Sequence, residues 1–171
     1  MNQINLNNLE LKTFTEQDAL DYCFLNNINP DDITVLWLRN NELTDISGIK
    51  IFKNLKELNL YENKLTDILS VKLLKNLKIL NIGYNNVIDI SFLKDLTKLK
   101  SLWLNNNKIK DISVIQYLKK LEILNINFLE LKSDQIQYIK NLKYLKELWC
   151  KNGFKNMSIL KQLNKRIYTY E

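Results

Sequence analysis

The chain has 171 residues, of which 46% are hydrophobic, enough for one domain with a continuous core. Three Gly and one Pro exclude a linker-rich chain, and the net charge of +6 permits an anionic partner without requiring one. No apolar run reaches the length of a membrane span, and the start MNQINLNNLELKTF lacks the basic and apolar regions of a signal peptide. We therefore expect a cytoplasmic protein without a transmembrane segment.

The composition also argues against catalysis and metal binding. The chain has no His, and its two cysteines, Cys23 and Cys150, lie far apart and outside any C-x-x-C pair. A Ser-His or Cys-His dyad is therefore excluded, and three Gly cannot form a G-x-G-x-x-G loop. We expect no enzyme, no cofactor and no metal, with both cysteines buried in a reducing compartment.

Residues 1–32 are interpreted as a divergent capping unit. The segment INLNNLELK at 4–12 aligns with LNINFLELK at 124–132. Four apolar side chains of this segment are expected to face inward: Ile4, Leu6, Leu9 and Leu11.

A helix follows in the same unit. Thr15 and Asp18 have the spacing of a capping box, which predicts a helix over Glu16–Asn26. Its side chains Leu20, Cys23 and Phe24 are expected to pack on the core. A loop at 30–32 then leads into a strand over Val35–Leu38.

The central part of the chain repeats with a period of 22 residues. The repeats begin at Ile33, Leu55, Leu77, Leu99 and Leu121, and apolar residues follow three and five positions later in each. Alternation within L-x-L places both apolar side chains on one face of a short strand. One repeat cannot bury this face alone, so the repeats are expected to stack with their strands parallel.

An asparagine occupies the ninth position of four repeats, within an apolar surrounding. These residues are Asn41, Asn63, Asn85 and Asn107. The chain must turn inward after each strand, and an amide side chain can pair the backbone N–H and C=O groups that the turn buries. The sequence therefore predicts a structural ladder of buried Asn. An Asp-Ile pair follows in each repeat, and its Asp (Asp45, Asp67, Asp89, Asp111) suits the N-cap of a short helix or turn.

This pattern, L-x-x-L-x-L-x-x-N-x-L with Asp-Ile after it, resembles the leucine-rich repeat. It is most similar to the 22-residue class of internalins and of the leucine-rich regulatory subunit of protein phosphatase 1. The resemblance covers nearly the whole chain. It implies an α/β solenoid, a horseshoe with a parallel β-sheet on the concave side and short 3-10 or helical turns on the convex side. It implies a binding module without specifying its partner.

The end of the chain departs from the pattern. In the fifth repeat Leu129 replaces the ladder Asn, and LKELWC at 145–150 restores the strand after 24 residues instead of 22. A helix capped by Ser133 is expected over Asp134–Lys143, and a closing strand at 166–170. The predicted organisation is a single domain with a capping unit at 1–32, five repeats at 33–144, and the last repeat and cap at 145–171.

The residue between the two apolar positions of each strand should point onto the open sheet face. All three tryptophans, Trp37, Trp103 and Trp149, share this column with Asn residues. Exposed aromatic residues among amides are typical of protein-binding surfaces. The expected contact residues, taken from this column and its neighbours, are Trp37, Arg39, Glu57, Tyr61, Glu62, Tyr84, Trp103, Phe128, Trp149 and Lys151.

We therefore predict a non-catalytic module that binds a partner protein through its concave face, as a monomer or weak homo-oligomer. Nucleic acid is disfavoured because the lysines lie on a different face from the tryptophans. One alternative is a secreted, internalin-like ligand binder of a bacterial surface. The other is a self-associating structural scaffold.

Overall fold

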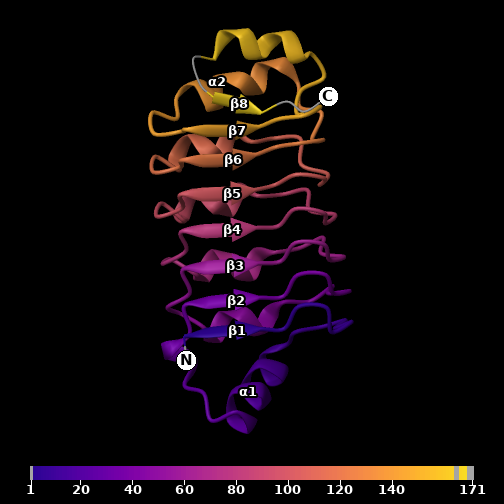
Figure 1. Cartoon of the computed structure of the whole chain (residues 1–171), viewed down its shortest axis with the longest axis vertical. Helices are drawn as coiled ribbons and strands as arrows, with labels where there is room; N and C mark the ends of the chain where they lie inside the picture. The colour runs from indigo at the N-terminus through magenta and orange to yellow at the C-terminus, as the bar shows by residue number, and fades with distance from the viewer. Residues whose placement is uncertain (1, 164–165, 169–171) are drawn as a thin grey trace.

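The strands of the protein stack in chain order into one sheet of eight parallel strands (Figure 1). The computed structural model describes residues 2–163 and 166–168. The strands are β1 (Gln3–Asn5), β2 (Val35–Trp37), β3 (Glu57–Asn59), β4 (Ile79–Asn81), β5 (Ser101–Trp103), β6 (Ile123–Asn125), β7 (Glu147–Trp149) and β8 (Arg166–Tyr168). The predicted repeat of parallel strands is confirmed.

The register of the sheet follows the sequence period. Leu36 pairs with Leu58, and the partners of the next strands are Leu80, Leu102, Leu124 and Leu148. The step from Leu124 to Leu148 is 24 residues, which confirms the longer fifth repeat. Because the register is constant, residues at one position of the repeat form a straight column across the sheet.

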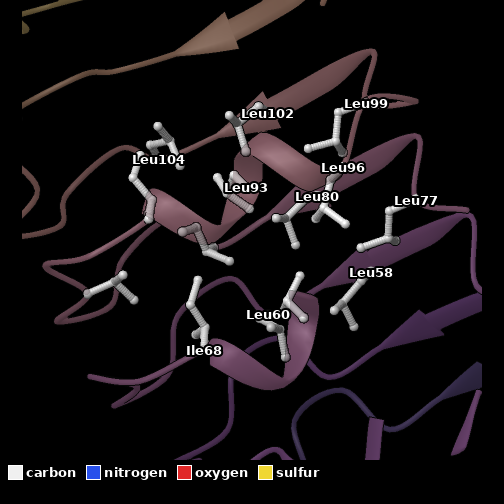
Figure 2. Packing of buried hydrophobic residues seen from close by; sticks show 14 of the residues in the cluster. Leu58, Leu60, Ile68, Leu77, Leu80, Leu93, Leu96, Leu99, Leu102 and Leu104 are labelled. Atoms are coloured by element: carbon white, nitrogen blue, oxygen red, sulfur yellow. The ribbon is translucent and has the colours of Figure 1, made fainter. Parts of the chain in front are cut away.

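A second layer of short 3-10 segments lies behind the sheet (Figure 1). The 3-10 segments of the described residues are η1 (Pro30–Asp32), η2 (Ser47–Ile51), η3 (Leu69–Leu73), η4 (Ser91–Asp95), η5 (Ser113–Tyr117), η6 (Ser133–Gln135) and η7 (Met157–Gln162). Figure 2 shows Leu80 and Leu102 directed from the strands towards Leu93 of η4 and Leu96 directly after it. All four are fully buried, and each such side chain contributes about 1.5–3 kcal/mol to folding.

The Asn ladder forms as predicted. Asn63 accepts a hydrogen bond from the Leu43 N–H at 3.0 Å and donates to the carbonyls of Leu38 and Leu60 at 2.9 and 3.1 Å. Each of the four ladder residues is no more than 9% exposed. The ladder ends at Leu129, whose carbonyl instead accepts a hydrogen bond of 2.9 Å from the Lys110 ammonium.

The Asp column precedes the 3-10 segments, but each Asp lies one residue before the N-cap position, which an Ile occupies instead of the predicted Asp. Asp67 Oδ1 accepts a hydrogen bond from the Leu69 N–H at 2.7 Å. The equivalent bonds of Asp45, Asp89 and Asp111, to the N–H groups of Ser47, Ser91 and Ser113, are 2.7–2.8 Å long.

The first unit carries helix α1 (Glu16–Leu25), and its capping box is confirmed. The Asp18 N–H donates to Thr15 Oγ1 at 3.2 Å, and the Thr15 N–H donates to Asp18 Oδ2 at 2.7 Å. The prediction that Leu20 and Phe24 pack on the core is wrong, since they are 44% and 84% exposed. The prediction for Cys23 is confirmed, since the helix buries Cys23 together with Ala19. Leu20 and Phe24 each lie one position further along, where the side chain is turned by about 100° away from that stripe.

The inward placement of the early apolar residues is confirmed for two of them. Ile4 and Leu6 are buried and Leu11 is partly buried, but Leu9 is 53% exposed, so its prediction is wrong. The Leu9 N–H donates to Asn41 Oδ1 at 2.9 Å between two residues with positive φ, which turns the Leu9 side chain outward.

The helix of the fifth repeat is shorter than predicted. Helix α2 (Ile136–Lys140) continues directly from η6, which begins at Ser133, and Ser133 does not act as its cap. The segment is fixed instead by Gln135, whose Oε1 accepts from the Ile112 N–H at 3.0 Å. The closing strand is confirmed over Arg166–Tyr168, and the remainder of its prediction lies outside the described residues.

Candidate protein-binding face

The open sheet face is formed by the strand side chains that point away from the leucine core and by the residues directly after each strand. Its central column comprises Asn5, Trp37, Asn59, Asn81, Trp103, Asn125 and Trp149. The three tryptophans are half-buried, in contrast to the fully buried apolar residues that flank them in sequence. Their indoles therefore belong to a surface and not to the core.

The Asn residues of this column have a local structural role. The Oδ1 atom of each accepts a hydrogen bond from the N–H two residues later, where the chain leaves the strand. The donors are Asn7, Tyr61, Gly83 and Asn127, at 3.0–3.1 Å. A tryptophan has no acceptor atom, so each Trp in the column replaces a turn-stabilising amide.

The three tryptophans differ in the interactions that they make within the molecule. Trp37 Nε1 donates to Glu57 Oε1 at 2.7 Å, so the hydrogen-bonding capacity of this indole is used between neighbouring strands. Trp149 also has an interaction within the molecule. Within residues 2–163 and 166–168, the Trp103 N–H has no hydrogen-bond partner, which leaves this indole as a free donor on the open face.

Two tyrosines and an arginine gather beside this column. The ring centroids of Tyr61 and Tyr84 lie 5.1 Å apart at an angle of 57°, and the Arg39 guanidinium lies 5.8 Å from the Tyr61 centroid. Burial raises the pKa of the Tyr61 hydroxyl above its ordinary value, Tyr84 and Glu62 raise it further, and Arg39 opposes them. The cluster is thus partly desolvated without being part of the core.

A second aromatic contact lies two repeats further on. The Lys151 ammonium is 5.9 Å from the centroid of the Phe128 ring, within cation–π range. Phe128 is 39% exposed and Tyr84 is 45% exposed, so both present apolar surface to solvent.

Tyr84 and Phe128 also have an unfavourable backbone conformation. They occupy the position before the ladder residue, which has positive φ in every described repeat. The residues of this column are Asn8, Asn40, Glu62, Tyr84, Asn106, Phe128 and Asn152, with φ between 47° and 61°. Asn tolerates this conformation, whereas a bulky aromatic residue there is a genuine outlier. Two repeats therefore hold exposed aromatic rings where the backbone favours Asn.

The structure groups the predicted contact residues as follows. Arg39, Tyr61 and Tyr84 form one cluster, with Glu62 exposed beside it, and Phe128 with Lys151 forms another. Trp37 and Glu57 bind each other, and Trp103 and Trp149 lie in the central column.

Sequence reasoning missed the roles of Gly83 and Asn105. Gly83 has no side chain, and a methyl group added to it would lie 2.5 Å from Asn105 Oδ1. Asn105 is 7% exposed although it lies on the open face. The sequence signal for these two residues is Trp103 in a column of Asn. A Trp there cannot accept from the N–H two residues later, which is that of Asn105, and Gly83 precedes Asn105 in the same column.

Among the described residues, neither a metal-binding cluster nor a membrane-spanning helix is found. No group of three or more His, Cys, Asp or Glu side chains converges among them. None of their helices has the length and apolar content needed to cross a bilayer. Burial raises the pKa of Cys150 to about 12, and that of Cys23 is also raised, so both thiols are protonated and unreactive at neutral pH.

Comparison with solved structures finds the same architecture in internalins of Listeria monocytogenes strain 4b F2365. Internalin InlF matches with a TM-score of 0.80 and 25% identity over 99% of this chain and 48% of its own. Internalin InlC2 matches with a TM-score of 0.76 and 23% identity over 88% of this chain and 72% of its own. The chain thus spans about half the length of the InlF structure.

A more distant match is the functional domain of InlJ from Listeria monocytogenes, described as including a cysteine ladder. Its TM-score is 0.64, at 17% identity, over 89% of this chain and 32% of its own. A comparison with curated proteins finds no match. The family profile described as Leucine Rich repeats (2 copies) matches residues 32–73, 75–117 and 97–135, more than half of the chain. The protein therefore belongs to the leucine-rich repeat family, with a fold that resembles the internalins.

Proposed function

We propose that this leucine-rich repeat domain is a non-catalytic module that binds a partner protein through its open sheet face. The contact surface centres on Tyr61, Tyr84 and Trp103 and extends to Phe128 and Lys151. Arg39, Glu62 and Trp149 lie around it, and Trp37 with Glu57 forms one border.

The observation that carries this proposal is the pair of exposed aromatic residues at positive φ. Residues in unfavourable backbone conformations cost about 1–3 kcal/mol and concentrate at functional sites. Other repeats hold Asn at the same position, so the fold has a more stable choice available. Tyr84 and Phe128 contact only neighbouring side chains of the open face, Tyr61 and Lys151 respectively, and present the rest of their rings to the outside, as protein-binding hot spots do.

The surface chemistry supports a protein over a polyanion. The open face carries Arg39 and Lys151 together with Glu57, Glu62 and Glu147, so its charges nearly balance. The excess lysines include Lys50, Lys72 and Lys94, which lie on the 3-10 layer instead. A nucleic acid or an anionic lipid would require the positive charge on the same face as the aromatic rings.

The test is a pull-down from a lysate of the source cells, comparing the wild type with a Trp103→Ala plus Tyr84→Ala double variant. A matched control removes exposed apolar surface from the opposite side, through Ile88→Ala plus Tyr117→Ala, both of which line a cavity of about 270 Å³ there. We expect the partner to be lost with the first pair and retained with the second. Equal recovery by all three folded baits would refute binding through the open face.

The resemblance to internalins supports a second candidate, a secreted ligand binder of a bacterial surface. Detection of the endogenous protein in culture medium or on intact cells would favour it, and detection in the cytosol would favour the cytoplasmic placement. A self-associating scaffold is the third candidate. Sedimentation velocity at two protein concentrations separates it from a monomeric binder, because only self-association makes the sedimentation coefficient rise with concentration.

A further inference from the structure

Asn105 differs from the other residues of its column on the open sheet face in its hydrogen bonds. In each described repeat the residue two positions after the central column has a backbone N–H that needs an acceptor. In the repeats with Asn in the column, that Asn supplies the acceptor, as Asn81 does for Gly83 at 3.0 Å. The repeats with Trp in the column need another solution.

Two of the three Trp repeats use an Asn from the preceding repeat. The Arg39 N–H, after Trp37, donates to Asn7 Oδ1 at 2.8 Å. The Lys151 N–H, after Trp149, donates to Asn127 Oδ1 at 2.7 Å. These two Asn residues are the neighbours of Arg39 and Lys151 in the same column.

The third Trp repeat lacks this solution. The residue that precedes Asn105 in its column is Gly83, which has no side chain to offer. In the described part of the chain, neither the Asn105 N–H nor its side-chain amide has a hydrogen-bond partner. Asn105 is only 7% exposed, yet no side-chain N or O atom of the described residues is both buried and without a partner, so the unpaired amide atoms of Asn105 reach solvent on the open face. They are therefore available to hydrogen-bond a partner molecule.

The surroundings of this amide are aromatic and neutral. Trp103, with its free indole N–H, lies two residues earlier at the end of β5, and the Tyr84 N–H donates to the Asn105 carbonyl at 2.9 Å. Within the column, the cations Lys151 and Arg39 lie two and three repeats away, roughly 10 and 14 Å at the usual strand spacing. A neutral acceptor therefore suits the site better than a carboxylate or phosphate.

We propose that Asn105 is the polar anchor of the open face, and that it binds a peptide group of the partner protein beside Trp103 and Tyr84. A peptide carbonyl accepts from the Asn105 N–H, and the Asn105 side-chain amide pairs with the donor and acceptor of the same segment. The aromatic rings contact the adjacent partner side chain. This inference rests on the proposed function and identifies the kind of group that is recognised.

Two substitutions would give the Asn105 N–H a hydrogen-bond acceptor within the chain. Gly83→Asn introduces the acceptor that Asn7 and Asn127 supply elsewhere, and Gly83 has no positive φ that would exclude a side chain. The group it crowds is the flexible end of the Asn105 side chain. Trp103→Asn supplies the acceptor from the same repeat, as Asn81 does, without adding bulk at position 83.

The experiment uses peptides of 12 residues, selected from a random displayed library on the wild-type chain. Binding of the tightest peptide is measured by fluorescence polarisation to the wild type and both variants. We expect each variant to keep or gain thermal stability and to lose at least tenfold in affinity. Ile88→Ala, on the opposite side, should leave the affinity unchanged. In the wild type, hydrogen exchange of the Asn105 N–H should slow when the peptide binds.

The results separate this inference from the general proposal. If Gly83→Asn and Trp103→Asn both bind the peptide as tightly as the wild type, or if the Asn105 N–H exchanges equally fast with and without peptide, the anchor is refuted. If the natural partner is lost with Trp103→Ala plus Tyr84→Ala but retained with Gly83→Asn, the open face binds the partner without using the Asn105 amide.

Discussion

Asn85 of the third repeat and Leu65 of the second are joined by a hydrogen bond of 3.0 Å from the Leu65 N–H to Asn85 Oδ1. The Asn85 amide nitrogen also donates to the carbonyls of Leu60 and Ile82, at 2.9 and 3.0 Å. One side chain thus satisfies backbone groups of two successive repeats. The ladder is therefore a structural link between repeats and does not form part of the binding face.

Asn85→Ala should consequently destabilise the fold without affecting partner binding at low denaturant. Removing the amide leaves several buried backbone groups unpaired, and we expect a loss of about 1–3 kcal/mol in the free energy of unfolding. Guanidinium titration followed by circular dichroism measures it. Asn86→Ala, at the neighbouring half-buried position, serves as the control. A difference below about 0.5 kcal/mol between the two variants would show that the ladder bonds contribute little.

Tyr84→Asn should raise stability while weakening partner binding. Tyr84 has φ of 54°, and the left-handed conformation costs about 1–2 kcal/mol for most residues but less for Asn. We therefore expect a gain of about 0.5–1 kcal/mol in the free energy of unfolding. Thermal and chemical denaturation measure the gain, and Tyr117→Asn, in a 3-10 segment without positive φ, should show none. A loss of stability in Tyr84→Asn would mean that the ring is held by packing.

Lys110 takes over where the ladder stops, because its ammonium donates to the Leu129 carbonyl at 2.9 Å. Lys110→Met keeps the length of the side chain and removes the donor. We expect a loss of about 0.5–1.5 kcal/mol in unfolding free energy, a modest value because the lysine is largely exposed. Lys108→Met, two residues earlier and also exposed, is the matched control. Equal denaturation midpoints for the two variants would contradict a capping role for Lys110.

Much of this molecule follows from its period. The leucine positions determine the strand register, and the buried Asn residues have the role that their chemistry predicts. Each Asp also bonds to the first N–H of a 3-10 segment, from one residue before the N-cap position predicted for it. The repeat constrains these positions because a shift by one residue would move every leucine to the solvent face. The first unit has no such constraint, and there the predictions for Leu9, Leu20 and Phe24 failed.

The details of the open face depend on relationships between repeats that a single repeat does not reveal. The sequence places Trp103 in a column but does not indicate that its N–H is free while that of Trp37 is bound to Glu57. Likewise, Gly83 matters because of Asn105, a residue 22 positions away whose N–H it leaves without an acceptor. Such side-chain pairings follow from geometry across the sheet and not from local sequence.

The last prediction concerns the buried thiol of Cys150, whose pKa burial raises from 9.0 to about 12. In the unfolded chain this thiol ionises near pH 9, whereas in the native state it keeps its proton until about pH 12. Between these values the native state binds more protons, so stability falls as the pH rises. The stability that depends on the protonated Cys150 thiol is fully present below pH 9. Above pH 9, the loss of unfolding free energy from this group approaches about 1.4 kcal/mol per pH unit.

Cys150→Ala should therefore reduce the alkaline loss of stability. The free energy of unfolding, measured by urea titration at intervals from pH 8 to pH 11, should decline less steeply in the variant than in the wild type, even though the variant starts lower because of its smaller buried side chain. Identical slopes would show that the Cys150 thiol is accessible to ionisation in the folded protein. The native thiol should also react with Ellman's reagent only after denaturation, because attack requires the thiolate and access to the reagent.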